Sequence, residues 1–68
     1  MTERQNILMR IAAQRNTIRE HIPKYYNDPP NHRNFALRTI QIAQERIRLL
    51  KSQANFHVDY DSADEWRP

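Results

Sequence analysis

The sequence predicts an all-α protein: an antiparallel two-helix hairpin, about residues 2–22 and 29–54, with an extended or disordered C-terminal tail over 55–68. Three observations predict this fold. Apolar residues recur at alternating spacings of three and four through both segments, which is typical of helices that pack along one seam. The 68-residue chain contains no glycine, the residue that tight hairpin turns between strands require. Beyond residue 54 the periodicity stops, and four acidic and three aromatic residues follow.

The first helix begins at a predicted capping box. The Thr2 side chain can accept from the amide of Gln5, whose own side chain reaches back to the amide of Thr2. Pro23 disfavours helical geometry in the preceding residue, so we expect the helix to end near residue 21 or 22. Its seam includes two polar residues, which we expect to set register or oligomeric state. The seam is Ile7, Ile11, Gln14, Ile18, His21 and Tyr25.

A short connector over residues 23–28 makes the second helix an antiparallel neighbour of the first. Two starts of the second helix are open. Either Asp28 caps it with Pro29 at the first helical position, which we favour, or Asn34 caps it and residues 29–33 stay extended. The seam alternates small and large side chains, so the two helices can approach closely. It consists of Ala36, Ile40, Ala43, Ile47, Leu50 and Ala54.

The chain divides into a helical hairpin over residues 1–54 and an acidic, aromatic tail over residues 55–68. The hairpin carries ten basic and four acidic side chains, a net charge of +6, whereas the tail carries four acids and Arg67, a net charge of −3. Alternate residues from Phe56 to Tyr60 are apolar, a strand pattern that has no second strand to pair with. The tail is therefore disordered, or it docks on the basic body or on a second protein.

A helical projection at about 100° per residue gives the hairpin one apolar and one basic face. A chain this short buries little surface, and an exposed apolar face would be costly. We expect a partner: a second copy that completes a four-helix bundle with two-fold symmetry, or a larger protein. The alternative is that the tail folds back over the apolar face. The candidate partner-binding residues are Met9, Phe35, Ile42 and Leu49 on the hairpin and Phe56, Tyr60 and Trp66 in the tail.

The basic face supports a second hypothesis, that a dimer binds RNA or DNA through phosphate contacts. Nine of the eleven cations are arginines, which suit bidentate phosphate contacts. In architecture, residues 2–54 are similar to the Rop family of plasmid copy-number regulators, dimers of helical hairpins that bind RNA; no sequence motif is shared. The candidate nucleic-acid-binding residues are Arg4, Arg15, Arg19, Arg48 and Lys51. A phage- or plasmid-type inhibitor of a host protein is a further alternative.

The composition argues against an enzyme. Without cysteine there is no thiolate zinc site, and without glycine there is no phosphate-binding loop or nucleophile elbow. The histidines and tail acids match no metal-ligand spacing, and two helices cannot enclose a pocket for a small-molecule substrate. We therefore expect no catalytic residue, no metal and no cofactor. The favoured hypothesis is an accessory or assembly protein that docks on a larger protein through its apolar face and aromatic tail.

Targeting signals are weak. No apolar run is long enough for a membrane span or for the core of a signal peptide. A cytoplasmic location is expected, since the absence of cysteine is compatible with it. The arginines and amphipathic pattern of residues 1–22 are similar in composition to a mitochondrial import sequence, so a mitochondrial location is the alternative.

Overall fold

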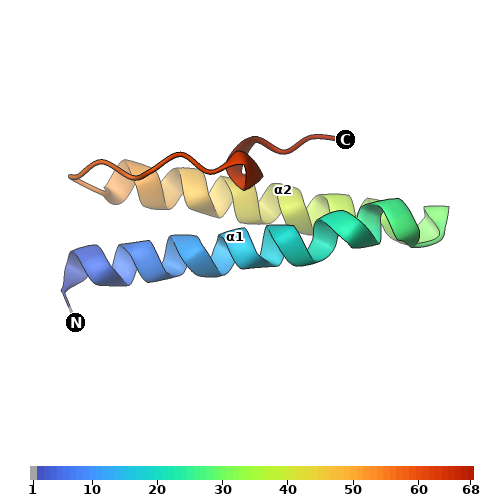
Figure 1. Cartoon of the computed structure of the whole chain (residues 1–68), viewed down its shortest axis with the longest axis horizontal. Coiled ribbons are helices and arrows are strands. Elements are labelled where there is room, and N and C mark those ends of the chain that lie inside the picture. The colour runs from blue at the N-terminus through green and yellow to red at the C-terminus, as the bar shows by residue number, and fades with distance from the viewer. Residues whose placement is uncertain (1) are drawn as a thin grey trace.

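The computed structural model describes residues 2–68 as two long antiparallel helices and a tail that returns along them (Figure 1). The helices are α1 (Glu3–Asn27) and α2 (Pro30–Gln53), and the tail contains one 3-10 turn, η1 (Ser62–Glu65). The molecule measures 42 × 20 × 15 Å. The predicted all-α hairpin is confirmed. The tail leaves the end of α2 near the start of α1 and runs back toward the middle of the hairpin.

The start of α1 is the predicted capping box. The amide of Gln5 donates to Thr2 Oγ1 at 3.1 Å, and the amide of Thr2 donates to Gln5 Oε1 at 3.0 Å. These two bonds satisfy amides that have no partner inside the helix. A short sequence signature therefore determines where α1 begins.

The predicted end of the first helix near residue 22 is wrong, because α1 continues through Pro23 to Asn27. A proline inside a helix removes one backbone hydrogen bond and bends the axis, but it does not always end the helix. The turn after Pro23 carries Tyr25 and Tyr26, whose rings meet Trp66 of the tail at centroid distances of 5.6 and 6.2 Å. These aromatic contacts with the tail stabilise the last turn of α1, which follows Pro23.

The helices are joined at Asp28 and Pro29, a much shorter connector than predicted. Each of these residues precedes a proline, which disfavours helical geometry, and both are extended, with ψ of 156° and 152°. Asp28 therefore closes α1, and its amide donates to the carbonyl of Lys24 at 2.9 Å. Pro29 occupies the N-cap of α2 and Pro30 follows it. Both predicted starts are wrong: capping by Asp28 misses by one residue, and Asn34 lies inside the helix.

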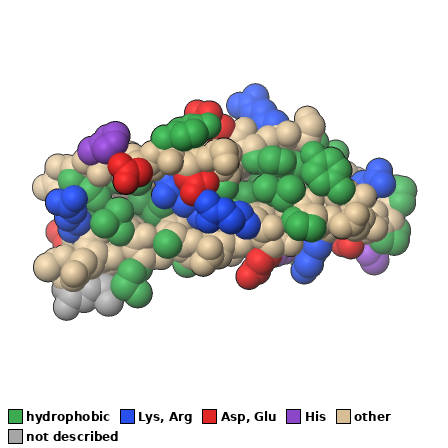
Figure 2. All heavy atoms as spheres, in the orientation of Figure 1, with side chains coloured by type: hydrophobic (Ala, Val, Ile, Leu, Met, Phe, Trp, Pro, Cys, Tyr) green, Lys and Arg blue, Asp and Glu red, His purple; other side chains and the backbone are tan. Residues whose placement is uncertain are grey.

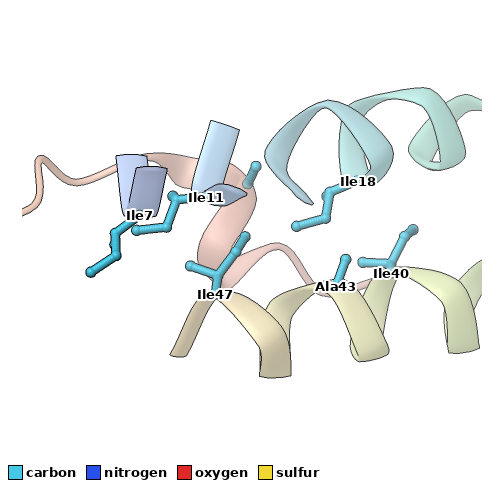
Figure 3. Packing of buried hydrophobic residues seen from close by; sticks show 7 residues of the cluster. Ile7, Ile11, Ile18, Ile40, Ala43 and Ile47 are labelled. Atoms are coloured by element: carbon cyan, nitrogen blue, oxygen red, sulfur yellow. The ribbon is translucent and has the colours of Figure 1, made fainter. Parts of the chain in front are cut away.

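The core is the predicted seam between the helices, where isoleucines from α1 and α2 point toward one another (Figure 3). Burying each isoleucine contributes about 1.5–3 kcal/mol relative to leaving it in water. One residue outside the hairpin, Ala63 of η1, is also buried in this core. The buried side chains of the two helices are Ile7, Ile11, Ile18, Ala36, Ile40, Ala43 and Ile47.

Candidate interaction surfaces

The tail lies on the basic face of the hairpin and is held there by Asp64. Arg15 of α1 donates to Asp64 from Nε at 2.9 Å and from Nη2 at 2.7 Å, and Lys51 of α2 donates to it at 2.7 Å. The Asp64 side chain is only 8% exposed. One carboxylate therefore connects the tail to both helices, and acidic and basic side chains lie next to each other near the middle of the molecule (Figure 2).

Two further polar contacts of the tail involve α1. Arg15 Nη2 also donates to the backbone carbonyl of Asp59 at 2.9 Å, and Arg19 pairs with Asp61. Asp61 is the N-cap of η1, because its Oδ1 accepts from the amide of Ala63 at 2.9 Å. The same side chain thus starts the 3-10 turn and binds the hairpin.

The end of the tail is held by Gln44 and by an aromatic cluster. Gln44 Nε2 donates to the carbonyls of Ala63 at 3.2 Å and Trp66 at 2.8 Å. The ring of Trp66 meets Tyr25 and Tyr26 edge to face, an arrangement that aromatic rings favour. The tail is therefore held on the hairpin by ion pairs, by hydrogen bonds to its backbone and by aromatic contacts.

The two tail acids that bind the hairpin, Asp61 and Asp64, have lowered pKa values. Burial works to raise the pKa of Asp64, but the hydrogen bonds from its two cationic partners outweigh burial and place the pKa below its ordinary value. The pKa of Asp61 is lowered first by the hydrogen bond from the amide of Ala63 and then by Arg19, against partial desolvation. Both carboxyls are therefore ionised at neutral pH, and charge holds the tail in place.

Each of the five candidate nucleic-acid-binding cations has a partner within the chain. Three of them bind tail acids, as described above. Arg48 pairs with Glu45, one turn earlier on α2, and Arg4 lies over the ring of Phe56 with its Cζ atom 4.9 Å from the ring centroid. The structure thus brings four of the five predicted cations into contact with residues 56–64 and pairs the fifth, Arg48, within α2.

The apolar face predicted for the hairpin stays exposed within residues 2–68. Phe35 is 72% exposed, Ile42 45% and Leu49 53%, and they repeat every seven residues along α2. Met9 of α1 is 58% exposed. The alternative in which the tail folds over these apolar residues is wrong, because the acids of the tail bind the cations of the basic face instead. We call Met9, Phe35, Ile42 and Leu49 the open face.

A shallow groove runs between α1 and α2 beside the open face. It consists of two adjoining hollows that share Gln14 and Arg46. We call it the open groove. Gln14, a predicted seam residue, is half-buried there, while His21, the other polar seam residue, bonds through Nδ1 to the carbonyl of Thr17 at 2.8 Å. The residues lining the open groove are Arg10, Ala13, Gln14, Thr17, Thr39, Ile42, Ala43, Arg46 and Leu50.

The predicted aromatic anchors of the tail lie in different surroundings. Phe56 and Trp66 are half-buried and pack against the protein's own core, whereas Tyr60 is 70% exposed and donates from its hydroxyl to Glu65 at 3.3 Å. Sequence reasoning did not identify Gln44 or Asp64 as binding residues. The available signal was an N-cap aspartate followed three residues later by an acid, which is typical of the first turn of a helix.

In residues 2–68, no three histidine, aspartate or glutamate side chains gather in a way that could hold a metal ion. Neither long helix has a stretch apolar enough to cross a membrane. Comparison with known proteins identifies no matching family model, no matching curated protein and no matching solved structure. The arrangement of these surfaces is therefore the basis for a functional proposal.

Proposed function

We propose that this protein is a non-enzymatic helical-hairpin interaction module, an accessory or assembly protein that docks on a larger protein through its open face. One observation carries the proposal. Three large apolar side chains of α2 and one of α1 stay exposed although the tail packs on the hairpin. Large exposed apolar side chains that form a line along one helix are typical of a protein-binding site.

The tail supports this choice of face. Phe56 and Trp66 already pack on the hairpin, so they are not free to anchor another protein while the tail is docked. Burying the open face against a partner would gain about 25 cal/mol per Å² of apolar surface removed from water. Large side chains at the centre of such a surface contribute most of the binding energy.

The test is capture of partners by the tagged 68-residue chain from an extract of its source, with quantitative mass spectrometry. Leu49→Asp should reduce the captured partner by about tenfold or more, because it places a charge in the apolar interface. Tyr60→Asp is the matched control, since it adds the same charge at an exposed apolar side chain of the tail. Circular dichroism should show unchanged helicity for both variants.

Two results would contradict the proposal. Leu49→Asp could leave the captured proteins unchanged, in which case the open face is not the docking surface. Alternatively, Tyr60→Asp could remove the partner while Leu49→Asp does not, which would assign docking to the tail.

A further inference from the structure

Two arginines line the open groove. Arg10 projects from α1 and Arg46 from α2, and both line the groove. Neither takes part in an ion pair within residues 2–68. On the opposite face, by contrast, cations from both helices bind acids of the tail. The open groove therefore presents positive charge that an acidic ligand can neutralise.

The tail shows what kind of segment fits between these two helices. Asp64 is bound by one cation from each helix, Arg15 and Lys51, at 2.7 Å in both cases. The neighbouring small residue, Ala63, is buried against the isoleucine core. The basic face of the hairpin thus binds an acidic segment, the tail, whose apolar side chains reach the seam between the helices.

The open groove repeats this arrangement with different residues. One arginine comes from each helix, and small side chains, Ala13 and Ala43, lie among the lining residues with Ile42 and Leu50. Small residues let a backbone or a side chain of a ligand approach the seam closely. An acidic segment with apolar side chains is the chemistry that complements such a groove.

The apolar residues of the open face favour a helical ligand. Phe35, Ile42 and Leu49 recur every seven residues, so they form a line nearly parallel to the axis of α2. The line extends over about two heptads, roughly 21 Å at 1.5 Å per residue. A second helix that lies along the hairpin can bury the whole line with its own apolar stripe.

We propose that the open groove binds an acidic amphipathic helix of another protein. The apolar stripe of that helix packs on the line from Phe35 to Leu49, and its carboxylates pair with Arg10 and Arg46. The complex is a bundle of three helices with the tail on its far side. A second copy of this chain fits less well, because its hairpin has a net charge of +6 and would bring further cations to the groove. This inference rests on the proposed function and specifies the chemistry of the partner.

The test uses the full chain and two synthetic helical peptides of about 18 residues, long enough to span the apolar line. Both have leucines at heptad positions; one has glutamates beside them and the other has lysines. Fluorescence anisotropy should show that the acidic peptide binds at least about tenfold more tightly than the basic one. The double variant Arg10→Glu/Arg46→Glu should reverse this preference.

The matched control is Arg33→Glu/Arg67→Glu, which changes the net charge equally at two exposed arginines that do not line the groove. It should keep the preference for the acidic peptide. Circular dichroism checks that both double variants keep their helicity. If both double variants lost the preference for the acidic peptide equally, only net charge would matter, and the inference would be overturned.

Other outcomes also decide the question. No binding of the acidic peptide at about 1 mM overturns the acidic-helix inference; if Leu49→Asp still removes a captured partner, the proposed function stands. A dimer in sedimentation that Ile42→Asp converts to a monomer would assign the open face to a second copy. Displacement of the acidic peptide by single-stranded RNA would assign the groove to nucleic acid and would also overturn the inference.

Discussion

Asp64 holds three parts of the chain together, because its carboxylate binds Arg15 on α1 and Lys51 on α2 while the tail carries it. Charge-assisted hydrogen bonds of this kind are stronger than neutral ones, and partial burial limits their screening by water. Removing one of these three charged side chains leaves the others partly buried without an ionic partner. The position of the tail should therefore be sensitive to this single side chain.

We predict that Asp64→Asn weakens tail docking by about 1.5–3 kcal/mol, because it removes the charge and keeps the shape. Trp66 is the only tryptophan in the chain and contacts two tyrosines of α1, so its fluorescence reports tail docking. Asp59→Asn is the control, since the Asp59 side chain is 97% exposed and only its backbone carbonyl binds Arg15. Unchanged fluorescence and thermal midpoint in Asp64→Asn would contradict this role.

The same carboxylate predicts how stability depends on pH. The pKa of Asp64 is lower in the folded chain than in the unfolded chain, where it is about 3.9. Its contribution is therefore complete above the unfolded value and is lost as the pH falls through the folded value. Tryptophan fluorescence should show the tail leaving below about pH 4 in the native protein. In Asp64→Asn this acid transition should be smaller; an identical transition would assign it to other groups.

The boundary between the two helices is set by prolines, because no glycine is available for a left-handed cap at the end of α1. No residue from 2 to 68 has a positive φ. Asp28 and Pro29 are extended because a proline follows each of them. Pro23, in contrast, stays inside α1, where the contacts of the last turn with the tail support it.

We predict that Pro23→Ala raises the free energy of unfolding by roughly 1–3 kcal/mol, because alanine restores a helical hydrogen bond and has a higher helix propensity. Pro30→Ala is the matched control; at the start of α2 its missing amide hydrogen costs nothing, so little change is expected. Thermal unfolding followed by circular dichroism measures both. A lower midpoint for Pro23→Ala would show that the proline is needed to bring Tyr25 and Tyr26 to Trp66.

The hairpin has two faces: the tail covers one, and the other stays exposed. The tail, with a net charge of −3, covers the cations of a body with a net charge of +6. The open face stays exposed, and the open groove beside it carries Arg10 and Arg46, which form no ion pair within residues 2–68. The nucleic-acid hypothesis therefore requires the tail to leave, since the predicted phosphate-binding cations have internal partners.

We predict that releasing the tail strengthens binding to single-stranded RNA by about tenfold or more at low salt, because Arg15, Arg19 and Lys51 become free. The variant is Asp61→Asn/Asp64→Asn in the full chain. Its affinity should also fall more steeply with salt than that of the native protein, as phosphate contacts are added. Gel retardation at two salt concentrations measures both effects.

The control for this prediction has the same change in net charge. Asp59→Asn/Glu65→Gln removes two tail charges and leaves the ion pairs with the hairpin in place. It should bind RNA little better than the native protein. Equal binding by both variants would show that net charge, and not the covering of the basic face, limits RNA binding.

Much of the hairpin was predictable from the sequence because its signals are local. The capping box at Thr2 and the seam from Ile7 to Ile18 depend on residues three or four positions apart. The division into a basic and an apolar face follows from the same helical periodicity. Sequence alone therefore determined two amphipathic helices joined by a proline turn, together with the side chains that meet between them.

The tertiary structure decided where the tail lies and which surface remains free. Asp64 binds Arg15, which is 49 positions away, and Gln44 binds the carbonyl of Trp66, 22 positions away. No periodic pattern encodes such pairs, because they depend on the geometry of two packed helices. The continuation of α1 through Pro23 is similar, since tail contacts formed only in the folded chain outweigh a local preference. Long-range charge and packing thus decided which face the tail covers.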